Sequence, residues 1–166
     1  MKKKFNGKLI KVFEKKTLLP NSEIINLEIV KHPGAVLIIP FLSKDKIVLL
    51  KQFRPVIEAY IYELPAGTLE QNELASVCAK RELIEETGYR AKKIKKIGKI
   101  YPCPGYSTEK ISIFTAHDLS VCPQQLEKDE IIQTKIYSKA EIVKLFKQGK
   151  IFDAKTICAL SMCGLI

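Results

Sequence analysis

Apolar residues in the first two-thirds of the chain follow the pattern of β-strands. In residues 25–29 every second position is apolar, as in a strand with one buried face. The segments 35–41 and 47–53 are rich in apolar residues over the length of a buried strand. Alternation returns at residues 111–115 and 132–136. Each of these segments is expected to form a strand.

Three segments carry helix signals. The clearest runs from about Glu70 to Glu86 and ends before Gly88, because glycine is a common helix stop. A second helix should begin at Ser138, which has capping-box spacing to Glu141, and a third should follow Asp153 as its N-cap. Mixed strands with few helices predict an α/β or α+β sandwich rather than a doubly wound sheet.

The chain has 166 residues, which suits one domain, and we expect a single unit spanning residues 1–166. No stretch approaches the ~20 consecutive apolar residues of a membrane span. The basic N-terminus leads into no hydrophobic signal core. The five cysteines are irregularly spaced without a CxxC pair, so neither structural zinc nor disulfides are expected. These features favour a cytoplasmic protein with no membrane partner.

The formal net charge of +10 favours anionic partners such as phosphates, nucleotides or nucleic acid. The lysines are spread along the chain, with local clusters at residues 2–4 and 92–96. Basic and aromatic residues do not interleave as they would in a platform for single-stranded nucleic acid. We therefore expect most lysines to be solvated surface residues, and nucleic acid is the weaker alternative as a partner.

The helix expected before Gly88 carries Glu82, Glu85 and Glu86 at positions i, i+3 and i+4, so their carboxylates share one face. Like charges at this spacing repel, and a bound cation would offset the repulsion. Hard oxygen ligands without histidine or cysteine favour Mg²⁺, with Mn²⁺ as a substitute. Such a metal site suits hydrolysis of a phosphoric anhydride. Three glutamates alone would favour the alternative of a solvated acidic helix face.

The wider segment Gly67–Tyr89 reads GTLEQNELASVCAKRELIEETGY and resembles the Nudix box, G-x5-E-x7-R-E-U-x-E-E-x-G-U, where U is a bulky aliphatic residue. The one departure is Tyr89 at the last U position, which is a packing site. The chain is therefore identified as a member of the Nudix hydrolase superfamily, whose fold is a mixed β-sheet sandwiched between helices. The matching positions are Gly67, Glu73, Arg81, Glu82, Leu83, Glu85, Glu86 and Gly88.

The resemblance implies roles for residues in and beside the box. The metal-binding glutamates of the family match Glu82, Glu85 and Glu86. Ala66 matches a residue whose backbone carbonyl often completes the metal site. Arg81, paired with Glu73, matches a residue that holds the loop-helix-loop in shape and orients the glutamates. We expect Glu86 and Arg81 to belong to the catalytic set.

Segments outside the box resemble the ADP-ribose pyrophosphatase subfamily. Pro104 lies 16 residues after Gly88, at the place of that subfamily's downstream proline. The resemblance implies that Pro104 and Gly105 shape a turn at the rim of the substrate pocket and that Glu109 contacts the substrate. Arg54 offers a planar fork suited to two diphosphate oxygens.

A general base is expected in the loop 126–131, because similar enzymes carry a glutamate on a mobile loop before the last strand. We favour Glu127, with Glu130 and Asp129 as the alternatives. The same residues could instead be a charged, solvated loop without a catalytic role.

The expected reaction is Mg²⁺-dependent hydrolysis of ADP-ribose to AMP and ribose 5-phosphate. The main alternative keeps the chemistry and changes the substrate to a nucleotide sugar such as GDP-mannose. An RNA-processing protein and a nucleotide sensor without hydrolysis are weaker alternatives. The resemblance also implies a homodimer in which the N-terminal strands, about residues 1–32, help to form the adenosine pocket. Phe5 or Phe13 could stack on adenine there or could simply be core residues.

Overall fold

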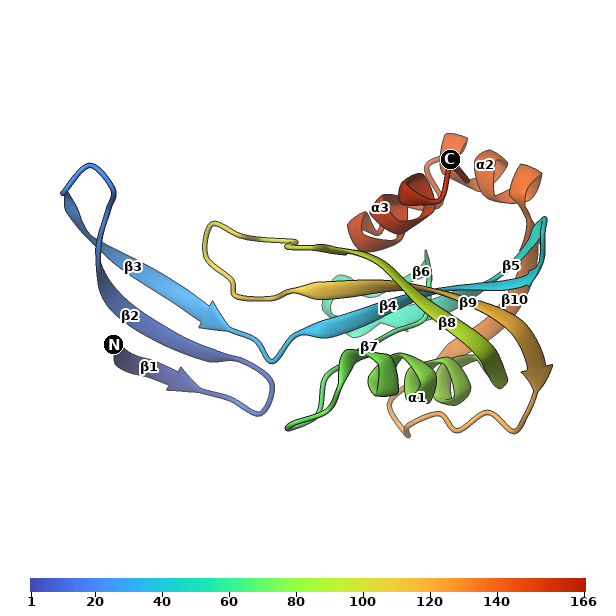
Figure 1. Ribbon diagram of the computed structural model, residues 1–166, viewed down its shortest axis with the longest axis horizontal. Helices are drawn as coiled ribbons and strands as arrows, with labels where there is room; N and C mark the ends of the chain where they lie inside the picture. Colours follow the sequence, from blue (N-terminus) through green and yellow to red (C-terminus); the bar gives the residue numbers. More distant parts are fainter.

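The strands form two sheets, and the computed structural model describes all of residues 1–166 (Figure 1). The larger sheet has seven strands in the order β10-β5-β4-β9-β8, with β6 paired to β5 and β7 paired to β4. Strands β4 and β9 run parallel and its other pairings are antiparallel, so this sheet is mixed. Its elements and those that cover it are β4 (Ala35–Ser43), β5 (Lys46–Arg54), the 3-10 turn η1 (Pro55–Ile57), β6 (Ala59–Glu63), β7 (Ala66–Thr68), α1 (Ala75–Thr87), β8 (Tyr89–Ile100), β9 (Ile111–Val121), β10 (Ile132–Ser138), α2 (Lys139–Lys147) and α3 (Ala154–Met162).

Both faces of the larger sheet are covered, because successive residues of β4 point to opposite sides of the sheet. Leu37 and Ile39 belong to a core that includes residues of α2 and α3. Val36 and Ile38 belong to a second core that includes residues of α1. All four side chains are fully buried. The predicted arrangement of a mixed sheet sandwiched between helices is therefore confirmed (Figure 1).

Helix α1 begins at Ala75, later than the start expected near Glu70. Asn72 has a φ of 64°, a left-handed conformation that the interior of an α-helix excludes. Leu74, just before the helix, and Val77 in its first turn are exposed. The side chains of α1 that do pack against the sheet are Cys78, Ala79 and Leu83.

The two C-terminal helices begin where the capping signals predicted. Ser138 and Glu141 form a complete capping box at α2. The carboxylate of Asp153 accepts a hydrogen bond from the Thr156 N–H at the start of α3. Strand β8 was not predicted from its sequence, because lysines interrupt the apolar pattern. It lies at the edge of the sheet, where lysines discourage pairing with another chain.

The three N-terminal strands, β1 (Lys2–Asn6), β2 (Lys11–Leu18) and β3 (Ile24–Lys31), form a separate antiparallel sheet. It extends away from the rest of the molecule, with the N-terminus in it (Figure 1). The loop before β9 joins it to the main body, since Val30 exchanges backbone hydrogen bonds with Tyr106 (2.8 Å) and Thr108 (2.9 Å). The strand expected at residues 25–29 is present, but its apolar residues are only partly covered.

All five cysteines are free thiols. No helix has both the length and the apolar character needed to cross a membrane.

Candidate active site

A cleft of about 460 Å³ lies along the α1 side of the larger sheet. Almost all of its lining is polar or charged, and both signs of charge are present. The lining residues come from the β1–β2 turn (Lys8), from β5 (Gln52 and Arg54), from residues 66–70, from α1 (Arg81, Glu82, Glu85 and Glu86) and from the loop before β10 (Glu127 and Glu130).

The three box glutamates do not share one environment. Glu82 and Glu86, one turn apart on α1, are 8% and 2% exposed, whereas the Glu85 side chain is 31% exposed. Glu86 faces β7, where its carboxylate accepts a hydrogen bond from the Ala66 N–H (2.8 Å). This contact places the Glu86 carboxylate beside Ala66, whose carbonyl was the fourth expected metal ligand.

Burial controls the protonation of the two enclosed carboxylates. It raises the pKa of Glu82 to about 7, although Arg81 acts in the opposite direction. It also raises the pKa of Glu86 well above 4.5, against the hydrogen bond from Ala66. The raised pKa values mean that the positive charge and hydrogen bonds around these two carboxyl groups do not compensate for their burial. A divalent cation would supply the missing positive charge, so the donor set fits a hard metal ion such as Mg²⁺.

Gly67 makes room for one of these carboxylates. A Cβ atom at this position would lie 1.8 Å from the Glu82 carboxyl group, so only glycine fits beside this conformation of Glu82. In the structure Arg81 lies between Glu82 (2.7 Å) and Glu85 (3.0 Å), and no three acidic, histidine or cysteine side chains converge as a metal-binding group. The predicted ligands are thus neighbours, but closing them around a metal requires side-chain rotation.

Arg81 joins the box helix to the segment that precedes it. Its Nε and Nη2 atoms donate to the two carboxylate oxygens of Glu73, at 3.0 Å each. The Arg81 hydrogen bond lowers the pKa of Glu73 to about 2, outweighing the opposing effect of burial. The remaining Nη1 atom reaches Glu82 and Glu85. These contacts are those of a residue that orients the glutamates.

The loop before β10 brings two of the three candidate bases to the cleft. Glu127 and Glu130 line it, whereas Asp129 is exposed and is not among its lining residues. The Glu130 carboxylate accepts a hydrogen bond from the Glu127 N–H (2.9 Å). Its charge contributes to the raised pKa values of Glu82 and Glu86, so it lies within electrostatic reach of both.

Arg54 lies at the end of β5, between this cleft and a second cavity of about 260 Å³. Glu109 and Lys155 line the second cavity as well. Arg54 binds the buried Glu63 through Nε (2.6 Å) and Nη2 (2.8 Å), so two of its three nitrogens are engaged within the protein. Arg54 and Glu109, which were each predicted to contact substrate, thus line the same cavity, whereas Glu63 as the partner of Arg54 was not predicted. The cleft and this second cavity are together called the groove.

The sequence profile of the NUDIX domain matches residues 31–160. The chain belongs to the Nudix family. The matched region contains the cleft-lining residues of β5, α1 and the loop before β10, whereas most of the N-terminal sheet lies before it.

Several relatives of this Nudix chain extend over most of its length. It is 40% identical to an ADP-ribose pyrophosphatase of Bacillus subtilis over 97% of the chain and 88% of the relative. It is 35% identical to a methanol dehydrogenase activator of Bacillus methanolicus, with the same two coverages. A GDP-mannose pyrophosphatase of Cronobacter sakazakii is 33% identical, over 80% of the chain and 78% of the relative.

A solved structure supports the Nudix fold independently of sequence. The crystal structure of an ADP compounds hydrolase superposes with a TM-score of 0.83, covering 98% of this chain and 88% of that one. The two sequences are 22% identical, so this similarity concerns the fold alone.

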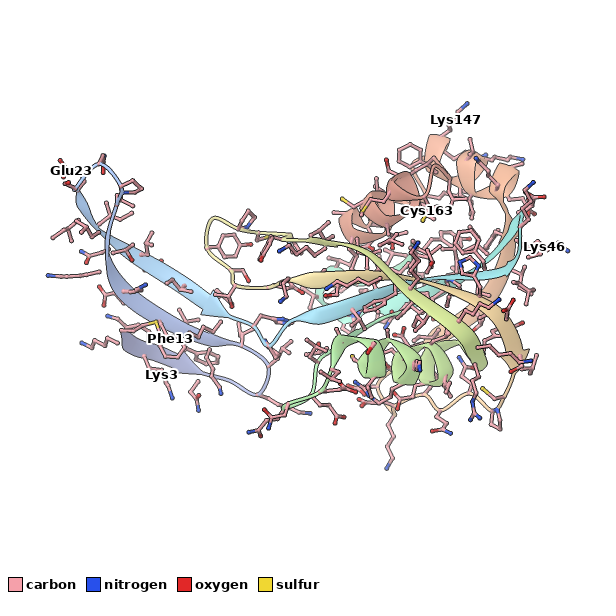
Figure 2. The ribbon with its side chains drawn as sticks, viewed as in Figure 1. Lys3, Phe13, Glu23, Lys46, Lys147 and Cys163 are labelled. Carbon is pink, nitrogen blue, oxygen red and sulfur yellow. The ribbon has the colours of Figure 1, made fainter.

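The downstream proline element of this Nudix chain does not lie where its expected role requires. Pro104 and Gly105 are exposed and line neither cavity. A Cβ atom at Gly105 would meet nothing within 4 Å. The loop instead holds β3, through backbone hydrogen bonds of Tyr106 and Thr108 to Val30. Figure 2 places Phe13 on the N-terminal sheet, away from α1, so it does not reach this cleft either.

Four residues that line or support the groove were not predicted from the sequence. Glu63 is fully buried, and its partner Lys155 lies 92 residues further along the chain, a contact that no local pattern reveals. Gln52 is 6% exposed, and its Oε1 atom is buried without a hydrogen-bond partner. Lys8 reaches the cleft from the N-terminal sheet. The apolar run at residues 47–53 predicted a strand but not which polar positions of β5 face the cleft.

Proposed function

We propose that this chain hydrolyses the diphosphate linkage of ADP-ribose to AMP and ribose 5-phosphate. The observation that carries the proposal is the pairing, in one groove, of two buried box carboxylates with the fork of Arg54. Carboxylates of this kind suit a divalent cation, and the cation and the arginine together suit a diphosphate. The identity to ADP-ribose pyrophosphatase over nearly the whole chain supports ADP-ribose as the substrate.

We assign the metal to Glu82, Glu85, Glu86 and the carbonyl of Ala66, and we take the metal to be Mg²⁺. When bound, the ion would polarise the attacking water and offset the charge of the diphosphate. On metal binding, Arg81 would lose part of its hydrogen bonding to Glu82 and Glu85 and would keep its hydrogen bond to Glu73. Arg54 would use its remaining nitrogen to bind a phosphate oxygen while Glu63 holds the rest of the guanidinium.

For the general base, the geometry favours Glu130 over Glu127. Glu130 is half-buried and its charge acts on the box glutamates, whereas Glu127 is exposed. Glu130 would accept the proton of the attacking water, and Glu127 would hold Glu130 through its backbone N–H. We retain Glu109 as a substrate contact in the second cavity.

The exposed apolar residues of the N-terminal sheet support a homodimer. Leu18 and Ile24, cross-strand partners in β2 and β3, are 68% and 67% exposed. Phe5 in β1 is 54% exposed. We propose that a second copy covers part of this sheet, and that the sheets complete the adenosine pocket of the partner. Free thiols throughout also suit the reducing cytoplasm, where we place the protein.

The proposed function is tested by measuring turnover of ADP-ribose, GDP-mannose, UDP-glucose, NADH and diadenosine polyphosphates with Mg²⁺ and with EDTA. We expect kcat/KM for ADP-ribose to exceed that for GDP-mannose by about tenfold or more, which requires only ~1.4 kcal/mol of differential binding in the transition state. The products should be AMP and ribose 5-phosphate. A preference for GDP-mannose would change the substrate and leave the site and reaction type intact. Release of orthophosphate as the first product would contradict the mechanism.

A further inference from the structure

Glu63 is the most enclosed ionised group beside the groove. It ends β6, and its side chain is 1% exposed. One carboxylate oxygen binds Arg54 Nε, and the other binds both Arg54 Nη2 and the ammonium group of Lys155. A buried carboxylate is stable only with partners of this kind. Glu63 therefore joins two cations, Arg54 and Lys155, that lie far apart in the sequence.

Lys155 binds a second carboxylate in addition to Glu63. It lies in the first turn of α3, where its Nζ atom also binds Asp153 Oδ1 (3.0 Å). The other oxygen of Asp153 caps α3 through the Thr156 N–H (3.0 Å). The Thr156 hydroxyl in turn accepts a hydrogen bond from the Leu64 N–H (2.9 Å), next to Glu63. The start of α3 is thus attached at two points to the strand end that precedes Ala66.

The electrostatics of this cluster depend on both cations. Burial alone would raise the pKa of Glu63, but the hydrogen bonds and charges of Arg54 and Lys155 outweigh burial and lower it. The hydrogen bond with Glu63 in turn raises the pKa of Arg54, so the guanidinium stays charged. Without Lys155, one oxygen of the buried carboxylate would lose its second partner, and the Arg54 fork would have to shift to compensate.

We infer that Lys155 is a positioning residue that acts through Glu63 to fix the orientation in which Arg54 meets the diphosphate. This inference rests on the proposed function, because it assumes that Arg54 binds a phosphate oxygen. Lys155 lines the same cavity as Arg54, and its amine is committed to Glu63 and Asp153. An arginine already held in its binding orientation binds a phosphate oxygen better than one that must be ordered on binding.

The test is a double-mutant cycle on ligand affinity and kinetics. The ligand is ADP-ribose with a methylene group in place of the bridging oxygen, measured by calorimetry with Mg²⁺; KM and kcat are measured with ADP-ribose. We expect Lys155→Met to weaken binding and raise KM about tenfold, equivalent to ~1.4 kcal/mol, with kcat within about threefold of the wild type. In an Arg54→Lys background the same change should alter affinity less than about twofold, because residues that act as one unit are not additive.

The matched control is Lys139→Met. Lys139 also ties a C-terminal helix down, through Nζ and the Gly164 carbonyl (2.7 Å), but it lines neither cavity of the groove. It should change Tm without changing affinity. Lys155→Arg should restore most of the affinity, because it keeps a charged donor for Glu63. If Lys155→Met does not fold, Lys155→Gln takes its place in the cycle.

Equal effects of the Lys155 change in both backgrounds, or a lower Tm with unchanged affinity, would overturn the inference and leave Lys155 a structural residue. If the wild type prefers GDP-mannose, the proposed function fails, and the cycle is run with the methylene analogue of that substrate. If the wild type binds neither analogue, the inference fails too, since Arg54 then has no diphosphate to meet.

Discussion

At the scale of single residues, the burial of Glu86 separates its effect on activity from its effect on stability. The carboxylate is 2% exposed, has a raised pKa because of burial, and accepts one hydrogen bond from the Ala66 N–H. Glu86→Gln keeps an oxygen for that N–H and removes the charge. We expect kcat/KM with Mg²⁺ to fall about 10²–10⁴-fold, because the proposed metal site would lose the charge of one ligand.

The thermal stability of Glu86→Gln should not fall with its activity. With EDTA present, thermal unfolding should give a Tm for Glu86→Gln that is equal to or above that of the wild type, because burying a carboxylate is costly. A clearly lower Tm would mean that the Glu86 carboxylate stabilises the fold itself, and undiminished activity would remove it from the metal site.

Glu73 provides a residue-level prediction about pH. Its pKa is lowered from 4.5 to about 2, with the Arg81 hydrogen bond as the largest cause. Because the folded pKa is depressed, the stabilisation is fully present above about pH 4.5 and is lost as the pH falls towards 2. Glu73→Gln should therefore lower Tm by a few degrees at pH 7, and the difference should shrink as the pH falls through this window.

The measurement is Tm against pH for the wild type and for Glu73→Gln, with Glu28→Gln as the control. Glu28 is an exposed glutamate on β3 that forms no ion pair, so its replacement should leave Tm nearly unchanged. A difference for Glu73→Gln that is constant from neutral pH down to about pH 2 would indicate a packing effect instead of the ion pair with Arg81.

At the scale of elements, the loop between β9 and β10 offers two glutamates that differ in burial and in electrostatic reach. We expect Glu130→Gln to lower kcat by about 10²-fold or more with little change in KM, because a general base acts mainly in the transition state. Glu127→Gln should lower kcat less than about tenfold, since its backbone N–H still binds Glu130. Steady-state kinetics of the two variants test this assignment. A larger loss of kcat in Glu127→Gln than in Glu130→Gln would make Glu127 the general base.

The elements that could be predicted from the sequence are those whose signals are local. Ser138 and Asp153 mark the starts of α2 and α3 because each caps an N–H group three residues away. The start of α1 was predicted too early, because helix propensity cannot reveal the left-handed turn at Asn72. In the same way, β8 was missed because its lysines meet solvent at a sheet edge, where tertiary position overrides the apolar pattern.

At the scale of the whole molecule, the residues of the candidate site also divide into those with a local sequence signal and those that only the fold brings together. Glu82, Glu85 and Glu86 could be read from the sequence because one helix carries them all. Glu63 and Lys155 could not, because the fold alone brings residues 92 positions apart into contact. The loop with Pro104 was assigned to the pocket rim by resemblance, and within one chain it holds the N-terminal sheet instead. The surface against which the N-terminal sheet packs therefore depends on whether the chain assembles with a second copy.

The N-terminal sheet is large enough to expose several apolar side chains yet touches the body of its own chain mainly through one loop. We expect the wild type to have a mass in solution of about 37.6 kDa, twice the chain mass of 18.8 kDa. Leu18→Lys combined with Ile24→Lys places two charges side by side on the exposed end of the sheet, which should disfavour burial against a partner.

Light scattering after size-exclusion chromatography should then give a mass near 18.8 kDa for the double variant. Val121→Lys is the control, since Val121 is 81% exposed at the end of β9, outside the N-terminal sheet. If the partner's sheet completes the adenosine pocket, the monomeric variant should also show a higher KM for ADP-ribose, whereas its box glutamates remain in place. A wild type that runs as a monomer with full activity would show that one chain suffices and that the exposed apolar residues of β1–β3 serve another purpose.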